Sequence, residues 1–60
     1  MSTSKMMNAA RAVARKSVKD FGKDYSRIFR VARESLKANG MQESILDAMA
    51  EHVMRDMIQL

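Results

Sequence analysis

The stretch SLKANGM, residues 35–41, decides where the chain turns back on itself. A segment with helical periodicity ends in Leu36 and Lys37, and Asn39-Gly40 follows it. Glycine readily adopts the left-handed conformation that closes many helices, and a cation in the last turn interacts favourably with the helix dipole. The sequence therefore predicts a helix end near residue 39 and a break in the chain at residues 39–41.

Upstream of this break, apolar residues recur every three or four positions from Met7 to Leu36. The series passes through Gly22 without losing phase, which is compatible with one bent helical arm over residues 5–38. A glycine inside a helix costs only about 1 kcal/mol relative to alanine, so Gly22 does not exclude such an arm. Asp24 is a favourable N-cap, however, and a helix of ~35 residues is unusual in a small chain. We therefore expect a break or kink at residues 22–24.

Downstream, residues 41–60 are predicted to form an acidic C-terminal helix. With no proline, two glycines and seven methionines, the composition favours helix almost throughout. We expect an all-α fold of two or three helices, arranged as a helical hairpin or a small bundle in a single domain over residues 1–60, with residues 1–4 frayed. The working picture is a hairpin of one long basic arm and one shorter acidic arm.

The size of the chain predicts self-association. A domain of 60 residues buries only about 60 % of the surface that its unfolded chain exposes, and the sequence has no cysteine to add a disulfide. We expect a homodimer in which apolar faces from each copy share a core. Aromatic residues beside arginines can stack bases in single-strand binders, but here they recur every fourth position on the apolar stripe, which favours the core. Methionines line the last helix and are expected to fill gaps in a helical interface. The candidate interface residues are Phe21, Tyr25, Phe29, Met49, Val53 and Met57.

Catalytic and cofactor-binding patterns are missing from the sequence. His52 is the one histidine, and its spacing to Asp56 favours a surface His–Asp pair rather than a catalytic pair. Both glycines are isolated, so neither belongs to a phosphate-binding loop. We expect no enzyme activity, no metal, no cofactor and no small-molecule substrate. No apolar run approaches the ~18 residues of a membrane span, and the lack of cysteine agrees with a cytoplasmic location.

Charge is the most informative feature of the sequence. Residues 1–40 carry ten of the eleven lysines and arginines and have a net charge of +7, whereas residues 41–60 have a net charge of −3. Helical spacing places the cations on the side opposite the apolar stripe. The candidate residues for binding nucleic acid or an acidic partner are Arg11, Arg15, Lys16, Lys19, Lys23, Arg27, Arg30, Arg33 and Lys37.

Three interpretations of these cations remain open. They could bind an external polyanion, or they could pair with an acidic edge made of Glu43, Asp47 and Glu51, folded back or supplied by another protomer. Alternatively, they could form a solvated face with local ion pairs, of the kind that helical spacing allows. The expected local pairs are Asp24–Arg27, Arg30–Glu34 and Glu34–Lys37.

The favoured function is that of a small non-enzymatic binding protein, whose basic face engages the phosphate backbone of nucleic acid or a nucleic-acid-processing complex. Acidic residues in the last helix argue against base-specific recognition by that helix. One alternative is a stoichiometric regulator or inhibitor, of viral or mobile-element type, that docks on an acidic or phosphate-binding groove of a target protein. Another is a structural subunit whose basic arm pairs with a neighbour's acidic arm.

Overall fold

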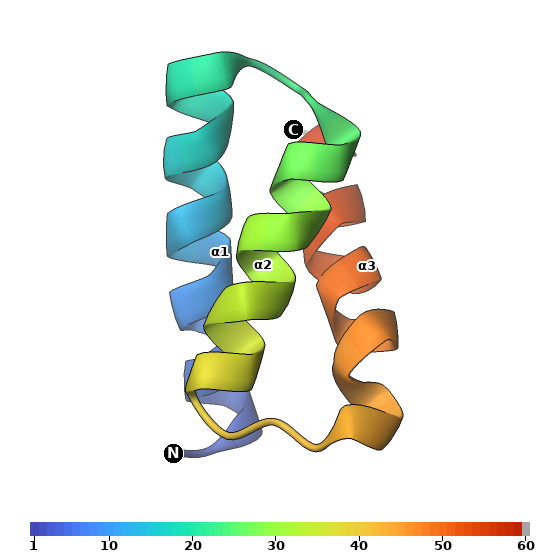
Figure 1. Ribbon diagram of the computed structural model, residues 1–60. Helices are drawn as coiled ribbons and strands as arrows, with labels where there is room; N and C mark the ends of the chain where they lie inside the picture. Colours follow the sequence, from blue (N-terminus) through green and yellow to red (C-terminus); the bar gives the residue numbers. More distant parts are fainter. Residues whose placement is uncertain (60) are drawn as a thin grey trace.

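The computed structural model describes residues 1–59, which form three α-helices (Figure 1): α1, Thr3–Phe21; α2, Tyr25–Ala38; and α3, Glu43–Gln59. Successive helices run in opposite directions, so α1 and α3 point the same way. Each helix packs against the other two, and the bundle measures 28 × 17 × 17 Å. The all-α prediction and its small-bundle alternative are confirmed, whereas the picture of a hairpin with one long basic arm is wrong.

The turn between α1 and α2 is formed by residues 22–24, where the break was expected. Gly22 has φ 78° and ψ −167°, a backbone conformation that is essentially restricted to glycine. Its N–H donates to the carbonyl oxygen of Val18 at 2.8 Å, which closes α1. The Asp24 side chain then accepts a hydrogen bond from the backbone N–H of Arg27 at 3.3 Å and caps α2. Although the apolar phase continues through this segment, the helix does not.

The second break confirms the prediction at residues 39–41. Gly40 has φ 93°, and its N–H donates to the carbonyl oxygen of Lys37, while the N–H of Met41 donates to that of Leu36, both at 3.0 Å. These two bonds define a Schellman motif, whose hydrophobic contact is usually made by the residues in the positions of Met41 and Leu36. Both side chains are buried in the core.

Two helix starts differ from the expected ones. The first helix begins at Thr3 rather than at Lys5, because the Ser2 side chain accepts a hydrogen bond from the Lys5 N–H at 3.3 Å. The last helix begins at Glu43 rather than at Met41, because Met41 is used to close the preceding helix. Both boundaries are therefore set by capping residues, Ser2 at the start of α1 and Met41 at the end of α2.

The core is built from one stripe of each helix. Alanines at Ala10, Ala14, Ala32 and Ala50 are fully buried, which lets the helix backbones approach closely. Larger side chains fill the remaining space between them. These are Met7 from α1, Ile28 and Leu36 from α2, Met41 from the second turn, and Leu46, Val53 and Met57 from α3. The accessible surface of 3946 Å² is close to the ~4,000 Å² expected for a folded monomer of this mass.

The predicted burial of the aromatic residues is only partly correct. Phe29 is partly buried and packs against the core. Phe21 and Tyr25 are 60 % and 57 % exposed, so their placement in the core is wrong. They are the last residue of α1 and the first residue of α2, and the turn carries both rings to the end of the bundle. Across residues 1–59, no helix is both long enough and apolar enough to cross a membrane.

Replacing Leu46 by alanine should remove about 2–5 kcal/mol of folding stability, since its side chain is fully buried and the deletion leaves a cavity. Ile45 provides a matched control, because it is the neighbouring residue on α3 and is 40 % exposed. Ile45→Ala should cost clearly less than Leu46→Ala. Urea unfolding followed by circular dichroism measures both variants, and equal losses would contradict the assigned core.

Replacing Gly22 by alanine should destabilise the protein by about 1–3 kcal/mol, because its backbone conformation is strained for any residue with a Cβ atom. The added Cβ would meet no atom within 4 Å, so the loss would come from the backbone and not from a clash. Thermal unfolding of Gly22→Ala measures the effect. A melting temperature equal to that of the parent chain would contradict the conformation assigned to this turn.

Candidate nucleic-acid interface

Two of the candidate cations are neutralised where α2 packs against α3. Arg33 Nε donates to Asp47 Oδ1 at 2.6 Å, and an Arg33 guanidinium nitrogen lies 3.8 Å from Glu43. Lys37 Nζ is 3.9 Å from the same Glu43 carboxylate. The hydrogen bond from Arg33 to Asp47 raises the pKa of Arg33, helped by the charges of Asp47 and Glu43. Part of the predicted acidic edge therefore folds back onto the basic helix within one chain.

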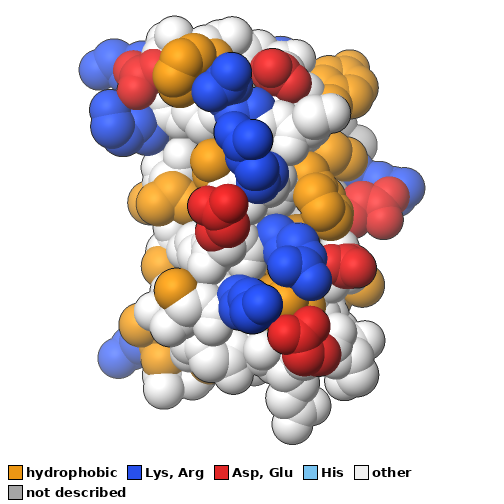
Figure 2. All heavy atoms as spheres, viewed as in Figure 1, with side chains coloured by type: hydrophobic (Ala, Val, Ile, Leu, Met, Phe, Trp, Pro, Cys, Tyr) orange, Lys and Arg blue, Asp and Glu red, His pale blue; other side chains and the backbone are white. Residues whose placement is uncertain are grey.

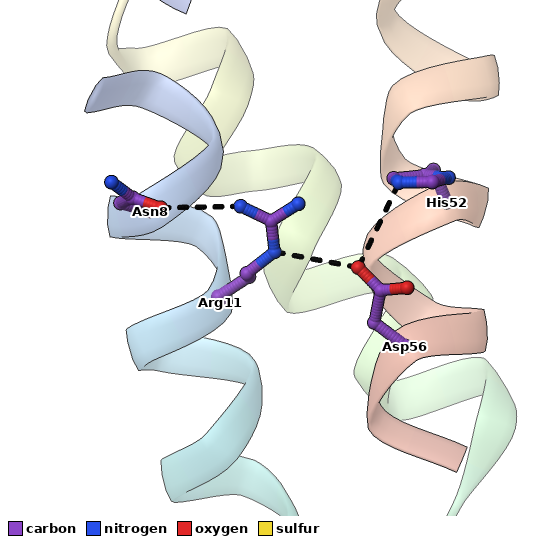
Figure 3. A network of polar contacts seen from close by, with 4 residues as sticks. All are labelled: Asn8, Arg11, His52 and Asp56. Atoms are coloured by element: carbon purple, nitrogen blue, oxygen red, sulfur yellow. Dashed lines mark hydrogen bonds and ion pairs between the residues drawn. The ribbon is translucent and has the colours of Figure 1, made fainter. Parts of the chain in front are cut away.

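Arg11 is neutralised by a separate network between α1 and α3 (Figure 3). Its Nε donates to Asp56 Oδ2 at 3.4 Å, and its Nη1 donates to Asn8 Oδ1 at 3.1 Å. His52 Nε2 lies 3.7 Å from the same Asp56 oxygen, which confirms the expected His52–Asp56 pair. The Arg11 and Asp56 side chains are 29 % and 36 % exposed, so this network is partly shielded from solvent. It connects two helices and leaves Arg11 poorly placed to contact an external ligand.

Among residues 1–59, the remaining candidates differ in whether they have a nearby acidic partner, a backbone acceptor or no ion pair. Lys16 pairs with Asp20 at 2.9 Å, and Arg27 pairs with Asp24 at 3.7 Å, as was expected for the latter. Lys23 Nζ donates to the carbonyl oxygen of Ile58. In the described part of the chain, the cations without an ion pair are Lys5, Arg15, Lys19 and Arg30.

Two predicted local pairs do not form. Glu34 has no ion pair within the described range, so the expected contacts with Arg30 and with Lys37 are both wrong. Lys37 instead reaches Glu43 on the neighbouring helix. Arg30, one turn before Glu34, remains exposed and unpaired among residues 1–59.

The net positive charge gathers at one end of the bundle, around the turn between α1 and α2. Residues 15–30, which we call the basic end, carry six cations and two acids, a net charge of +4 that equals the charge of the whole chain. The other described residues balance, with five cations and five acids. Figure 2 shows this difference over α2, where Asp and Glu side chains flank the cations on the α3 side in the lower half of the view.

A groove lies between α1 and α2 and is lined mostly by residues of the basic end. It has a volume of about 220 Å³ and combines apolar side chains with charged ones. Its lining consists of Val13, Lys16, Ser17, Asp20, Phe21, Arg27, Arg30 and Val31. The groove therefore places exposed apolar surface directly beside cations.

The predicted interface residues separate into two groups. Val53 and Met57 are buried in the core of the single chain, and Met49 and Phe29 are partly buried against it. Phe21 and Tyr25 are exposed at the basic end. Self-association stays a prediction, and the residues offered for it do not form one continuous surface.

Sequence reasoning favoured the core for the aromatic rings and so missed the exposure of Phe21 and Tyr25 at the basic end. The signal was the combination of Gly22 with the N-cap Asp24, since a turn there moves Phe21 and Tyr25 beyond the reach of the core.

The described residues contain no cluster of three or more His, Cys, Asp or Glu side chains that could hold a metal ion. Comparison with models of protein families, with curated proteins and with solved structures found no match to this chain.

The contact between Arg33 and Asp47 should stabilise the bundle through a favourable coupling energy. A double-mutant cycle of Arg33→Gln and Asp47→Asn, measured by urea unfolding, isolates this energy. The raised pKa of Arg33 keeps its charge at every pH up to and beyond neutrality, so the coupling should not change between pH 6 and 8. Added salt should weaken it by screening. A zero coupling at low salt would contradict the contact.

Proposed function

We propose that this chain is a small non-enzymatic helical protein that binds the phosphate backbone of nucleic acid through its basic end. The observation that carries the proposal is the concentration of the whole net charge of +4 within residues 15–30. Affinity for nucleic acid rises with the number of phosphates that cations neutralise, because each contact releases counterions. A cytoplasmic location forms part of the same proposal.

The geometry of the basic end supports contact with several phosphates at once. The bundle is 17 Å wide across its helices, and phosphates of one strand of a duplex recur every ~3.4 Å along the axis. Arg15, Lys19 and Arg30 are exposed and have no ion pair among residues 1–59. Such side chains can bind phosphate without first giving up an internal partner, whereas Arg11 and Arg33 would have to break one.

A second candidate is a regulator that docks on an acidic groove of a target protein. The groove between α1 and α2 favours it, because apolar lining beside cations also suits a protein partner. Both candidates use the basic end, so they differ in the ligand and not in the site. A partner protein should hold its affinity when nucleic acid is digested, and it should bury the groove rather than only the outward cations.

Neutralising two unpaired cations of the basic end should weaken nucleic-acid binding. We expect Lys19→Gln combined with Arg30→Gln to lower the affinity for a short DNA roughly tenfold to thirtyfold at about 0.1 M salt. The slope of log K against log salt should become shallower by about 1.4 for single strands and about 1.8 for duplex. Fluorescence anisotropy of a labelled oligonucleotide at several salt concentrations measures both quantities.

The matched control is Lys5→Gln combined with Lys37→Gln. It removes the same charge from the end of the bundle opposite the basic end. This control should retain most of the parent affinity and salt slope. Equal weakening by the two double variants would mean that binding follows net charge alone, and it would contradict a localised interface. Absence of binding to any nucleic acid would reject the proposed function.

A further inference from the structure

The basic end carries two aromatic rings that are not part of the core. Phe21 and Tyr25 flank the turn between α1 and α2, and each is more than half exposed. A single exposed aromatic residue is ordinary for a soluble protein. Here two rings lie four residues apart in sequence, within a segment whose net charge is +4. Apolar rings set among cations are the arrangement with which proteins bind unpaired bases.

One ring is already part of a stack. The guanidinium carbon of Arg27 lies 4.0 Å from the centroid of the Phe21 ring, which is a cation–π contact. Arg27 is tied to the N-cap Asp24 through both its backbone N–H and its side chain, so the stack is attached to the start of α2. Phe21 remains 60 % exposed, which leaves surface for a further planar group. A nucleobase is such a group, since every base presents a π face.

The groove beside Phe21 suits a ligand that is both planar and polar. Its apolar lining comes from Val13, Phe21 and Val31. The lining also contains the cations Lys16, Arg27 and Arg30, which lie beside this apolar surface. These charges favour an occupant that carries negative charge or hydrogen-bond acceptors over a purely aliphatic side chain.

We propose that the nucleic acid bound by the basic end is single-stranded, with bases stacking on Phe21 and Tyr25 while the surrounding cations hold the phosphates. This inference rests on the proposed function and names its ligand class. Bases of a duplex are paired and stacked on one another, so they cannot stack on these rings. Duplex DNA would gain only the phosphate contacts, whereas single strands would gain the phosphate contacts and the base stacking.

The test compares an oligothymidylate of about twelve nucleotides, within the usual footprint of single-strand binders, with a duplex of equal length. Tyr25 is the one tyrosine of a sequence without tryptophan, so the intrinsic fluorescence of the protein reports on this ring. Oligothymidylate should quench that fluorescence along a saturating curve, and duplex should not. N-acetyltyrosinamide in the same solutions corrects for light absorbed by the nucleic acid.

Substitutions of the two aromatic residues separate the contribution of base stacking to the affinity from that of charge. Phe21→Ala and Tyr25→Ala should each lower the affinity for oligothymidylate by about 5- to 150-fold, so the preference for single strands over duplex should fall. Tyr25→Phe and Phe21→Tyr keep the ring and should keep the preference. Ile45→Ala removes an exposed apolar side chain from α3, away from the basic end, and serves as the control. Circular dichroism verifies that every variant is folded.

Equal affinity of the parent chain for single strand and duplex would overturn the inference and leave the proposed function standing. An unchanged preference in the combined variant Phe21→Ala, Tyr25→Ala would overturn it as well. Failure to bind either form of nucleic acid would instead reject the proposed function itself. The expected result is tighter binding of the single strand, lost on removal of the rings and insensitive to Ile45→Ala.

Discussion

The turn of Gly22, Lys23 and Asp24 reverses the chain after α1, and both the core and the distribution of charge depend on it. Gly22 adopts a conformation that other residues avoid, and Asp24 restarts the helix at once through its cap. Without this turn, the apolar stripe would run along one long helix, and α3 alone would be too short to cover it. With the turn, α1 and α2 cover each other, and α3 covers the remaining side of both.

The same reversal determines which charges remain available. It places the C-terminal half of α1 beside the N-terminal half of α2, and the cations of both halves meet around the turn. At the other end, α3 begins with Glu43 and Asp47 next to Arg33 and Lys37, so those charges cancel. A chain that is basic over most of its length therefore folds into a bundle that is basic at one end.

The sequence predicted correctly those features of the fold that depend on a few neighbouring residues. The break at Asn39-Gly40 follows from a capping pattern confined to a few residues, and it was predicted correctly. Gly22 was ambiguous because the apolar phase continues through it, and phase alone cannot separate a bent helix from two helices. Phe21 and Tyr25 were assigned to the core for the same reason, since periodicity assumes that the helix continues.

Contacts between distant segments were the least predictable part of the candidate site. Local spacing suggested Glu34 as a partner for Arg30 and Lys37, yet Lys37 pairs with Glu43. The Arg11–Asp56 contact joins residues 45 positions apart and depends on how α1 and α3 pack. Sequence showed that acids could fold back onto the basic segment, and only the tertiary structure shows which cations they reach.

The core of the bundle forms without Phe21 and Tyr25. The three buried stripes already give the chain the accessible surface of a folded monomer of its mass. Burying two further rings would bring additional stability, and in a domain this small each such contribution matters. Leaving both rings in solvent, beside cations that repel one another, forgoes that gain. A ligand that supplies planar bases and negative phosphates would recover the apolar contact and relieve the repulsion at the same end of the bundle.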